Sequence, residues 1–121
     1  MAESFTGKRV LVTGAASGIG RAVALRLARD GAVLFLTDVN DGGLADTVSV
    51  ARAAGADVPE HRALDISDYD AVAEFAADIH ARHPAMDAVM NIAGISAWGT
   101  VDTLTHRHWR SMVDVNLMGP I

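Results

Sequence analysis

The chain has 121 residues, half of them hydrophobic, and its 15 acidic residues outnumber its 10 basic ones, giving a formal net charge of -5. The acidic balance argues against nucleic acid or a membrane surface as the main partner, and the hydrophobic fraction excludes a disordered chain. Because cysteine is absent, disulfides and thiolate metal sites are excluded, and we expect a single cytoplasmic domain over residues 1–121.

The first predicted elements are a strand at residues 9–13 and a helix that begins at Gly18. The strand, RVLVT, is short, β-branched and almost continuously apolar, which is typical of a strand covered on both faces. In the helix, apolar residues recur every four positions from Ile19, and Gly31 is placed to cap the C-terminal end.

The second predicted strand is the apolar run AVLFLTD at residues 32–38. Asn40 or Asp41 then supplies the N-cap of an alanine-rich helix, which is expected to run to about Gly55. The chain therefore repeats the order of a strand followed directly by a helix.

Two further strand–helix pairs complete the pattern. A third, shorter strand is expected at 61–66, and Ser67 then caps a helix in a capping box with Asp70. A fourth strand is expected at 86–94, where it runs into a glycine turn, and a last helix begins near Thr105.

This alternation predicts an α/β fold with a doubly wound parallel sheet. Right-handed crossovers place helices on both faces of such a sheet, which gives a Rossmann-like, three-layer α/β/α arrangement. Ligands of these folds bind at the carboxyl ends of the strands, where the strand order reverses.

The turn TGAASGIG between the first strand and the first helix is the clearest candidate for a ligand site. The free N–H groups and the positive dipole end of a helix N-terminus favour a phosphate there. Gly14 suits a tight turn, Gly18 a close approach of a pyrophosphate, and Gly20 close packing of the helix on the strand. The alternative is a helix cap with spare glycines.

Acidic residues end the second and third predicted strands. Asp38 follows the glycine turn by about the 20 residues expected for an acid that binds adenosine ribose hydroxyls and repels a 2′-phosphate. A helix-capping role is the alternative, although Asn40 and Asp41 are better placed for it. Asp65 and Ile66 are candidates to meet an adenine ring, while Asp65 alternatively helps to start the next helix.

Asn116 is predicted on the apolar, inward face of the last helix. The helical spacing that places it there is formed by Trp109, Met112, Val113, Asn116 and Leu117. A buried amide must find hydrogen-bond partners, so the residues alone leave two interpretations open. Asn116 either packs against the backbone or takes part in a reaction.

Several motifs together resemble those of the short-chain dehydrogenase/reductase family. The glycine turn has the spacing T-G-x-x-x-G-x-G, formed by Thr13, Gly14, Gly18 and Gly20. Asp38 is similar to the NAD-selecting acid of that family, and Ser17 stands where many NADP-using members carry a basic residue. NIAG at 91–94 resembles the family's N-N-A-G turn with one substitution, and WRSMVDVNLMGP at 109–120 resembles the helix that carries its active-site Asn.

The resemblance implies an NAD(H)-dependent oxidoreductase that transfers a hydride between nicotinamide and a secondary alcohol or carbonyl compound. It also implies the strand order 3-2-1-4, a homo-oligomer, and Asn116 as a catalytic residue that holds an ordered water in a proton relay. The cofactor-binding residues that it implies are Gly14, Ser17, Gly18, Ile19, Gly20, Asp38, Val39, Asp65, Ile66, Asn91, Ala93 and Gly94.

The resemblance also implies a Ser and a Y-x-x-x-K pair after the active-site Asn. The single tyrosine, Tyr69, and the single lysine, Lys8, do not have that spacing. The chain is therefore expected to be the N-terminal half of a single-domain oxidoreductase. The alternatives are a catalytically silent NAD-binding module, either regulatory or completed by another chain, and a nucleoside-binding domain with different chemistry.

Two remaining features carry weaker expectations. His80 and His83 can share a helix face, but neither a Cys nor an acid completes a ligand set, so we expect no metal site. Trp98 lies in the loop after the fourth strand, where it forms either a wall of the substrate pocket or an exposed loop residue.

Overall fold

A computed structural model describes residues 4–121, and its four strands form one parallel sheet in the order β3-β2-β1-β4. The central strand β1 (Arg9–Thr13) pairs with β2 (Val33–Asp38) on one side and with β4 (Ala88–Met90) on the other. β2 also pairs with the edge strand β3 (Asp57–Ala63). The predicted strand order and parallel sheet are confirmed.

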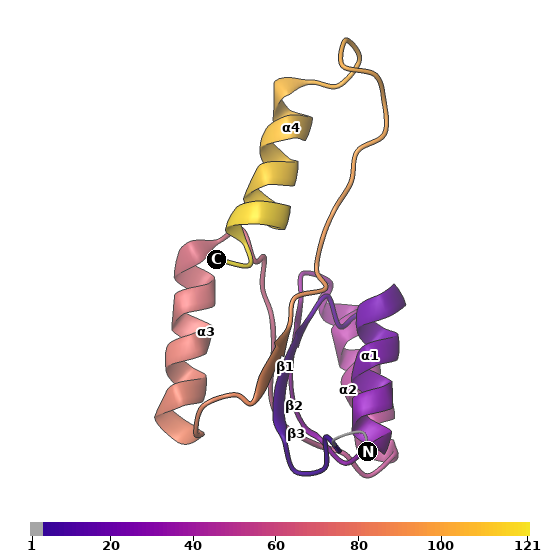
Figure 1. Ribbon diagram of the computed structural model, residues 1–121, viewed down its shortest axis with the longest axis vertical. Coiled ribbons are helices and arrows are strands. Elements are labelled where there is room, and N and C mark those ends of the chain that lie inside the picture. The colour runs from indigo at the N-terminus through magenta and orange to yellow at the C-terminus, as the bar shows by residue number, and fades with distance from the viewer. Residues whose placement is uncertain (1–3) are drawn as a thin grey trace.

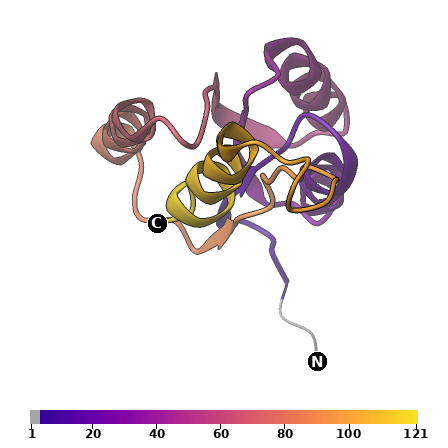
Figure 2. The same cartoon turned by 90° about the horizontal axis from the view of Figure 1, so that it is seen from above.

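The helices cover both faces of the sheet, which confirms the three-layer arrangement (Figure 1). The helices α1 (Gly18–Arg29) and α2 (Asp41–Ala53) lie on one face, and α3 (Tyr69–Arg82) lies on the other. The last helix, α4 (His106–Val113), stands beyond the ends of the strands and continues as a π-helical turn, η1 (Asp114–Met118). Figure 2 shows the same separation of α3 from α1 and α2 when the molecule is seen from above.

The continuous apolar character of β2 follows from burial on both faces. Leu34 and Leu36 belong to the larger core, in which β1 and β2 pack against α1 and α2. Phe35, between them, points to the opposite face and packs against Phe75 and Ile79 of α3. All three β2 side chains are fully buried, because alternate residues of a strand face opposite layers.

β3 begins earlier than predicted, and its expected bounds of 61–66 are wrong. The strand spans Asp57–Ala63, and its pairing with β2 contains a register shift between Val33 and Phe35. Pro59 lies in this irregular stretch of β3. Proline cannot donate a ladder hydrogen bond, and an edge strand tolerates it because one side of the strand has no partner in the described sheet. Asp65 and Ile66 therefore lie in the loop after β3 rather than at its end.

Two other predicted boundaries also differ. Asp68, not Ser67, is the N-cap of α3, because its carboxylate accepts a 3.1 Å hydrogen bond from the Ala71 N–H. The predicted capping box with Asp70 is therefore wrong, whereas Asn40 caps α2 through a 3.1 Å bond from the Gly43 N–H.

β4 is shorter than the predicted 86–94, because the chain leaves the sheet after Met90. The hydroxyl oxygen of Thr13, at the end of β1, accepts hydrogen bonds from the N–H groups of Ile92 and Ala93, each at 3.1 Å. A side chain therefore replaces the strand ladder here and turns the chain across the carboxyl end of β1.

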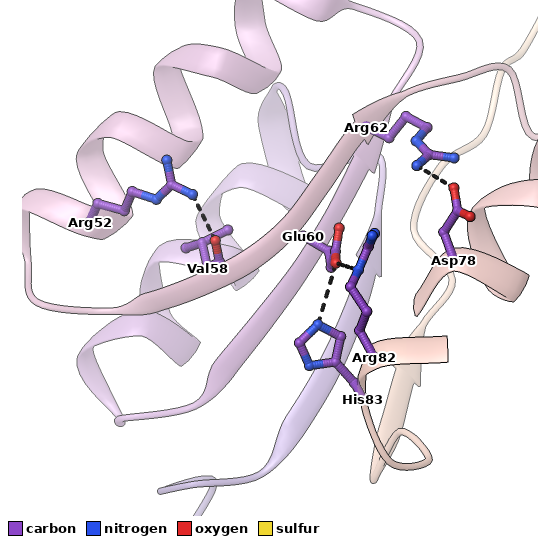
Figure 3. A network of polar contacts seen from close by, with 7 residues as sticks. All are labelled: Arg52, Val58, Glu60, Arg62, Asp78, Arg82 and His83. Carbon is purple, nitrogen blue, oxygen red and sulfur yellow. Dashed lines mark hydrogen bonds and ion pairs between the residues drawn. The ribbon is translucent and has the colours of Figure 1, made fainter. Parts of the chain in front are cut away.

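Ion pairs fasten α3 to β3 (Figure 3). Arg62 of β3 binds Asp78 of α3 at 2.7 Å, and Glu60 of β3 accepts from Arg82 at 2.8 Å and lies 3.4 Å from the His83 ring. Burial raises the pKa of Glu60, but the hydrogen bonds and charges of Arg82 and His83 outweigh it and hold that pKa below its ordinary value. The network holds the C-terminal half of α3 against β3.

Candidate functional site

A pocket of about 600 Å³ opens at the carboxyl ends of the strands. Four loops, the first turn of α1, and residues of α4 and η1 contribute to it. This is the location expected for the ligand of a doubly wound sheet. It is lined by Gly14, Ser17, Gly18, Ile19, Gly20, Asp38, Val39, Leu64, Asp65, Ile66, Ser67, Ile92, Ala93, Gly94, Ile95, Ser111, Asp114 and Val115. Every residue of the predicted cofactor site except Asn91 is in this lining.

The three glycines of the turn are constrained in three different ways. Gly14 has φ +69°, and a Cβ atom there would lie 2.8 Å from the Ala93 nitrogen. Gly18 has φ +53°, but a Cβ atom there would meet only open space. A Cβ atom at Gly20 would overlap the carbonyl oxygen of Gly14. Gly14 and Gly20 are therefore needed for close packing, whereas Gly18 leaves room on the pocket side.

The N-terminus of α1 is open towards the pocket. Ser17 is its N-cap residue but makes no side-chain capping hydrogen bond, and the first turn contains no acidic side chain. The N–H groups of a first helical turn have no acceptor within the helix. Because Gly18, Ile19 and Gly20 line the pocket, this end of α1 presents unpaired donors and a positive dipole to a bound anion.

The Asp38 carboxylate bridges the glycine turn and the start of α2. One oxygen accepts from the Ala16 N–H at 2.9 Å, and the other accepts from the Asn40 N–H at 2.9 Å. Asp38 is partly exposed at the pocket wall and does not cap α2, since Asn40 does so. Each carboxylate oxygen retains a lone pair for a further donor, such as a ribose hydroxyl.

Asp65 and Ile66 belong to the pocket wall that the loop between β3 and α3 contributes. One oxygen of Asp65 accepts from the Ser67 N–H at 2.9 Å and from its hydroxyl at 2.7 Å, so this carboxylate orders the turn before α3. A Cβ atom at Gly119 would lie 2.8 Å from the Ile66 side chain, so the chain after η1 packs directly against this wall. The alternative role of Asp65 near the helix start is therefore realised, while the residue also lines the pocket.

Asn116 does not have the buried position that the helical spacing predicts. It lies in the π-helical turn and is exposed, and its amide binds the backbone of Ile95. The Asn116 oxygen accepts from the Ile95 N–H at 2.9 Å, and its nitrogen donates to the Ile95 carbonyl at 2.7 Å. The structure thus shows the backbone-tethering role that was one of the two interpretations, and Asn116 is not among the pocket-lining residues.

The apolar face of α4 and η1 is exposed rather than buried. Trp109 is 44% exposed and Leu117 57% exposed, and the edge strand β4 likewise exposes Val89. The expected inward orientation of this helix face is therefore not realised within the described residues. The physical reason is that α4 stands beyond the strand ends, where the four-stranded sheet does not reach it.

Sequence reasoning missed the contribution of α4 to the pocket. Ser111, Asp114 and Val115 line it from the side of the helix away from the apolar stripe. Their spacing of i, i+3 and i+4 marks one helix face, but nothing local indicates that this face meets the glycine turn. Asp114 is paired with Arg110 at 3.0 Å, and no Lys or Arg belongs to the pocket lining.

The remaining predicted features lie away from the pocket. Trp98 is 93% exposed, and Asn91 is exposed and outside the pocket lining. Tyr69 follows the carboxyl end of β3, whereas Lys8 precedes the amino end of β1, so the two lie towards opposite ends of the parallel strands.

No group of three or more His, Cys, Asp or Glu side chains within residues 4–121 is arranged to hold a metal ion. No helix in the same range combines the length and apolar character that crossing a bilayer requires.

Comparisons with known proteins agree with this geometry. A model of the short chain dehydrogenase family matches residues 8–121. SadH of Mycobacterium tuberculosis is 42% identical over 119 residues, which are 98% of this chain and 43% of that protein. A short chain dehydrogenase/reductase from Burkholderia phymatum, solved in complex with NAD, is 36% identical with a TM-score of 0.90, over 98% of this chain and 42% of that chain.

A gluconate 5-dehydrogenase from Burkholderia cenocepacia, solved in complex with NADP and tartrate, is 30% identical with a TM-score of 0.85, over 96% of this chain and 45% of that chain. The chain therefore spans less than half the length of each of these three relatives. This share of the length is consistent with the prediction that the chain is the N-terminal half of the family's pattern.

Proposed function

The chain belongs to the short chain dehydrogenase family, and from this premise we propose that it carries the cofactor site of an NAD(H)-dependent oxidoreductase. The intact protein would transfer a hydride between the nicotinamide and a secondary alcohol or carbonyl compound. The observation that carries the proposal is the pocket formed by the open N-terminus of α1, the Gly18 turn and the Asp38 carboxylate. Because the chain covers less than half of its relatives, the activity is proposed for the whole protein.

The residues of the pocket fit a dinucleotide. The space in front of Gly18 and the free N–H groups of the first α1 turn suit a pyrophosphate. Asp38 would accept the adenosine ribose hydroxyls, and Ile66 would pack against the adenine ring. Ala93 and Gly94 would let the nicotinamide ribose approach the backbone at the end of β4. When bound, the nicotinamide supplies the hydride donor or acceptor.

We further propose that NAD(H) is preferred over NADP(H). Solved relatives contain either cofactor, as the complexes with NAD and with NADP show, so the family alone does not decide. Within the pocket, Asp38 would repel a 2′-phosphate, and the lining offers no Lys or Arg to neutralise one. Ser17 leaves the adjacent position uncharged.

Asn116 remains our proposal for the residue that holds a water in a proton relay. Its amide is bound to the Ile95 backbone in the structure, which leaves one amide hydrogen and one oxygen lone pair for a water. The groups that exchange the substrate proton are proposed to be a Ser and a Y-x-x-x-K pair elsewhere in the intact protein. We also propose a homo-oligomer, on the basis of the family, and a cytoplasmic location, which the lack of cysteine favours.

The proposal is tested by measuring NADH and NADPH affinity and alcohol-dependent NAD⁺ reduction with the intact protein. We expect tighter NADH binding and turnover with at least one member of a panel of secondary alcohols. Binding without turnover on any alcohol or ketone of the panel would favour the silent NAD-binding module. Failure to bind either nucleotide would contradict the proposal and favour a nucleoside-binding domain with different chemistry.

A further inference from the structure

We infer that Thr47 of α2 is a positioning residue for the cofactor-binding turn, although it lies outside the pocket. Its hydroxyl donates a 2.8 Å hydrogen bond to the carbonyl oxygen of Ala15, which lies 32 positions earlier in the chain. The inference rests on the proposed dinucleotide function of the pocket. It adds a buried residue that holds the backbone of the cofactor-binding turn without lining the pocket.

Thr47 is a buried polar residue whose position requires an explanation. Its side chain is 0% exposed, within a helix face that otherwise packs Leu44, Val48 and Ala51 into the core. A threonine within a helix commonly satisfies its hydroxyl with the carbonyl four residues earlier, and Gly43 offers that acceptor at 3.2 Å. The shorter bond reaches out of the helix to Ala15 instead.

The bond matters because it holds one end of a peptide unit whose other end is also held. The carbonyl of Ala15 accepts from Thr47, and the N–H of Ala16 in the same peptide plane donates to Asp38 at 2.9 Å. Rotation of this peptide would break both bonds at once. Asp38 and Thr47 flank the Asn40 cap of α2, so a single strand–helix unit fixes the turn.

This peptide sits directly behind the pocket. Ala15 is 0% and Ala16 4% exposed and neither lines the pocket, whereas Gly14 and Ser17 on either side of them do. The orientation of the Ala15–Ala16 peptide therefore sets the direction in which the chain enters Ser17 and the first turn of α1. Loss of the Thr47 hydroxyl would leave a buried carbonyl without its partner and free the turn to rotate.

Gly43 explains how α2 comes close enough for this contact. A Cβ atom at Gly43 would lie 3.0 Å from both the Cβ and the carbonyl oxygen of Ala16. The first turn of α2 therefore packs directly against the cofactor-binding turn. Thr47 lies four residues later on the same helix face, where its hydroxyl meets Ala15.

The test uses hydroxyl-matched variants of the intact protein. Thr47→Val removes the hydroxyl and keeps the shape, Thr47→Ala removes both the hydroxyl and the methyl, and Thr47→Ser keeps the hydroxyl. Thr37→Val is the matched control, because Thr37 is also buried and its hydroxyl donates to a backbone carbonyl, that of Arg62, at 2.7 Å. Its main-chain carbonyl, which accepts from the Ala15 N–H, is unchanged by the substitution.

NADH affinity is measured by fluorescence titration, and folding by urea unfolding of the same samples. We expect Thr47→Val and Thr47→Ala to raise the NADH Kd about fivefold to tenfold. Thr47→Ser and Thr37→Val should stay within about twofold of the wild type, although Thr37→Val is also expected to lower stability. In steady-state assays, loss of the Thr47 hydroxyl should raise the KM for NADH and leave kcat unchanged.

Equal Kd values for Thr47→Val and Thr37→Val would overturn the inference, as would equal values for Thr47→Ala and Thr47→Ser. The comparison of Thr47→Ala with Thr47→Ser still tests the inference if Thr47→Val does not fold. A wild-type protein that binds no NADH would instead overturn the proposed function together with this inference. Wild-type binding with unchanged affinity in all Thr47 variants would overturn the role of Thr47 alone.

Discussion

Replacing Asp38 by alanine should change cofactor selectivity and stability through two separable contacts. The Asp38 carboxylate accepts hydrogen bonds from the N–H groups of Ala16 and Asn40, each at 2.9 Å. Asn40 is exposed, so water replaces its bond at little cost. Ala16 is 4% exposed, so its N–H would lose a charged partner inside the protein. A hydrogen bond to a charged group contributes about 1.5–3 kcal/mol, and we expect Asp38→Ala to lower the free energy of unfolding by about that amount.

The effect on selectivity is independent of this loss. Asp38→Ala would remove ribose hydrogen bonds from NADH and electrostatic repulsion from NADPH. The ratio of the NADPH Kd to the NADH Kd should therefore fall about 5-fold to 150-fold, which corresponds to a change of about 1–3 kcal/mol in the difference between the two binding free energies. Because both nucleotides meet the same fraction of folded protein, the ratio is insensitive to the loss of stability.

The assay is fluorescence titration of the intact protein with each nucleotide, beside urea unfolding. Asp38→Asn is the companion variant, since it retains one acceptor oxygen and removes the charge. Asp38→Asn should lower the ratio of the NADPH Kd to the NADH Kd, and it should lower the free energy of unfolding by less than Asp38→Ala does. An unchanged Kd ratio in both variants would refute a ribose-binding role for Asp38. Unchanged unfolding of Asp38→Ala would refute its role as an anchor of the glycine turn.

Three further outcomes are expected. Gly18→Val and Gly55→Val should each lower the free energy of unfolding by about 1–2 kcal/mol, since both glycines have positive φ and open surroundings. Only Gly18→Val should abolish NADH binding in calorimetry, because Gly18 lines the pocket. Equal NADH affinities of the two variants would show that Gly18 serves the turn alone. The pKa of Glu60 is lowered from its ordinary value, so its contribution to stability is complete above the pKa of the unfolded chain and is lost as the pH falls through the lowered pKa. Glu60→Gln should flatten this acid limb in urea unfolding followed against pH, and an unaltered limb would contradict the assignment. A polypeptide limited to residues 1–121 should self-associate, because it exposes Leu117 and the apolar helix face around it. It should lack dehydrogenase turnover, because Tyr69 and Lys8 do not have the Y-x-x-x-K spacing. Sedimentation showing a stable monomer at micromolar concentration, or NADH production above a mock preparation, would contradict this.

The sequence by itself determined the features that depend on neighbours in the chain. The alternation of strands and helices, the glycine turn and the Asn40 cap each follow from patterns within one or two helical turns. The three glycines have separate constraints: positive φ and backbone crowding exclude other residues at Gly14, positive φ disfavours them at Gly18, and crowding excludes them at Gly20. Asp38 is predictable because the end of a parallel strand returns to the same edge as the turn.

Only the tertiary structure decided the features that depend on packing between distant segments. Pro59 sits in an edge strand whose register shift no local pattern indicates, so the bounds of β3 could not be predicted. Asn116 has the spacing of a buried residue, yet the position of α4 beyond the sheet leaves it exposed. The pocket wall at Ser111 and the Thr47 bond to Ala15 likewise join segments that meet only after folding. Periodicity shows which residues share a helix face, but the packing of the helices and sheet decides what that face contacts.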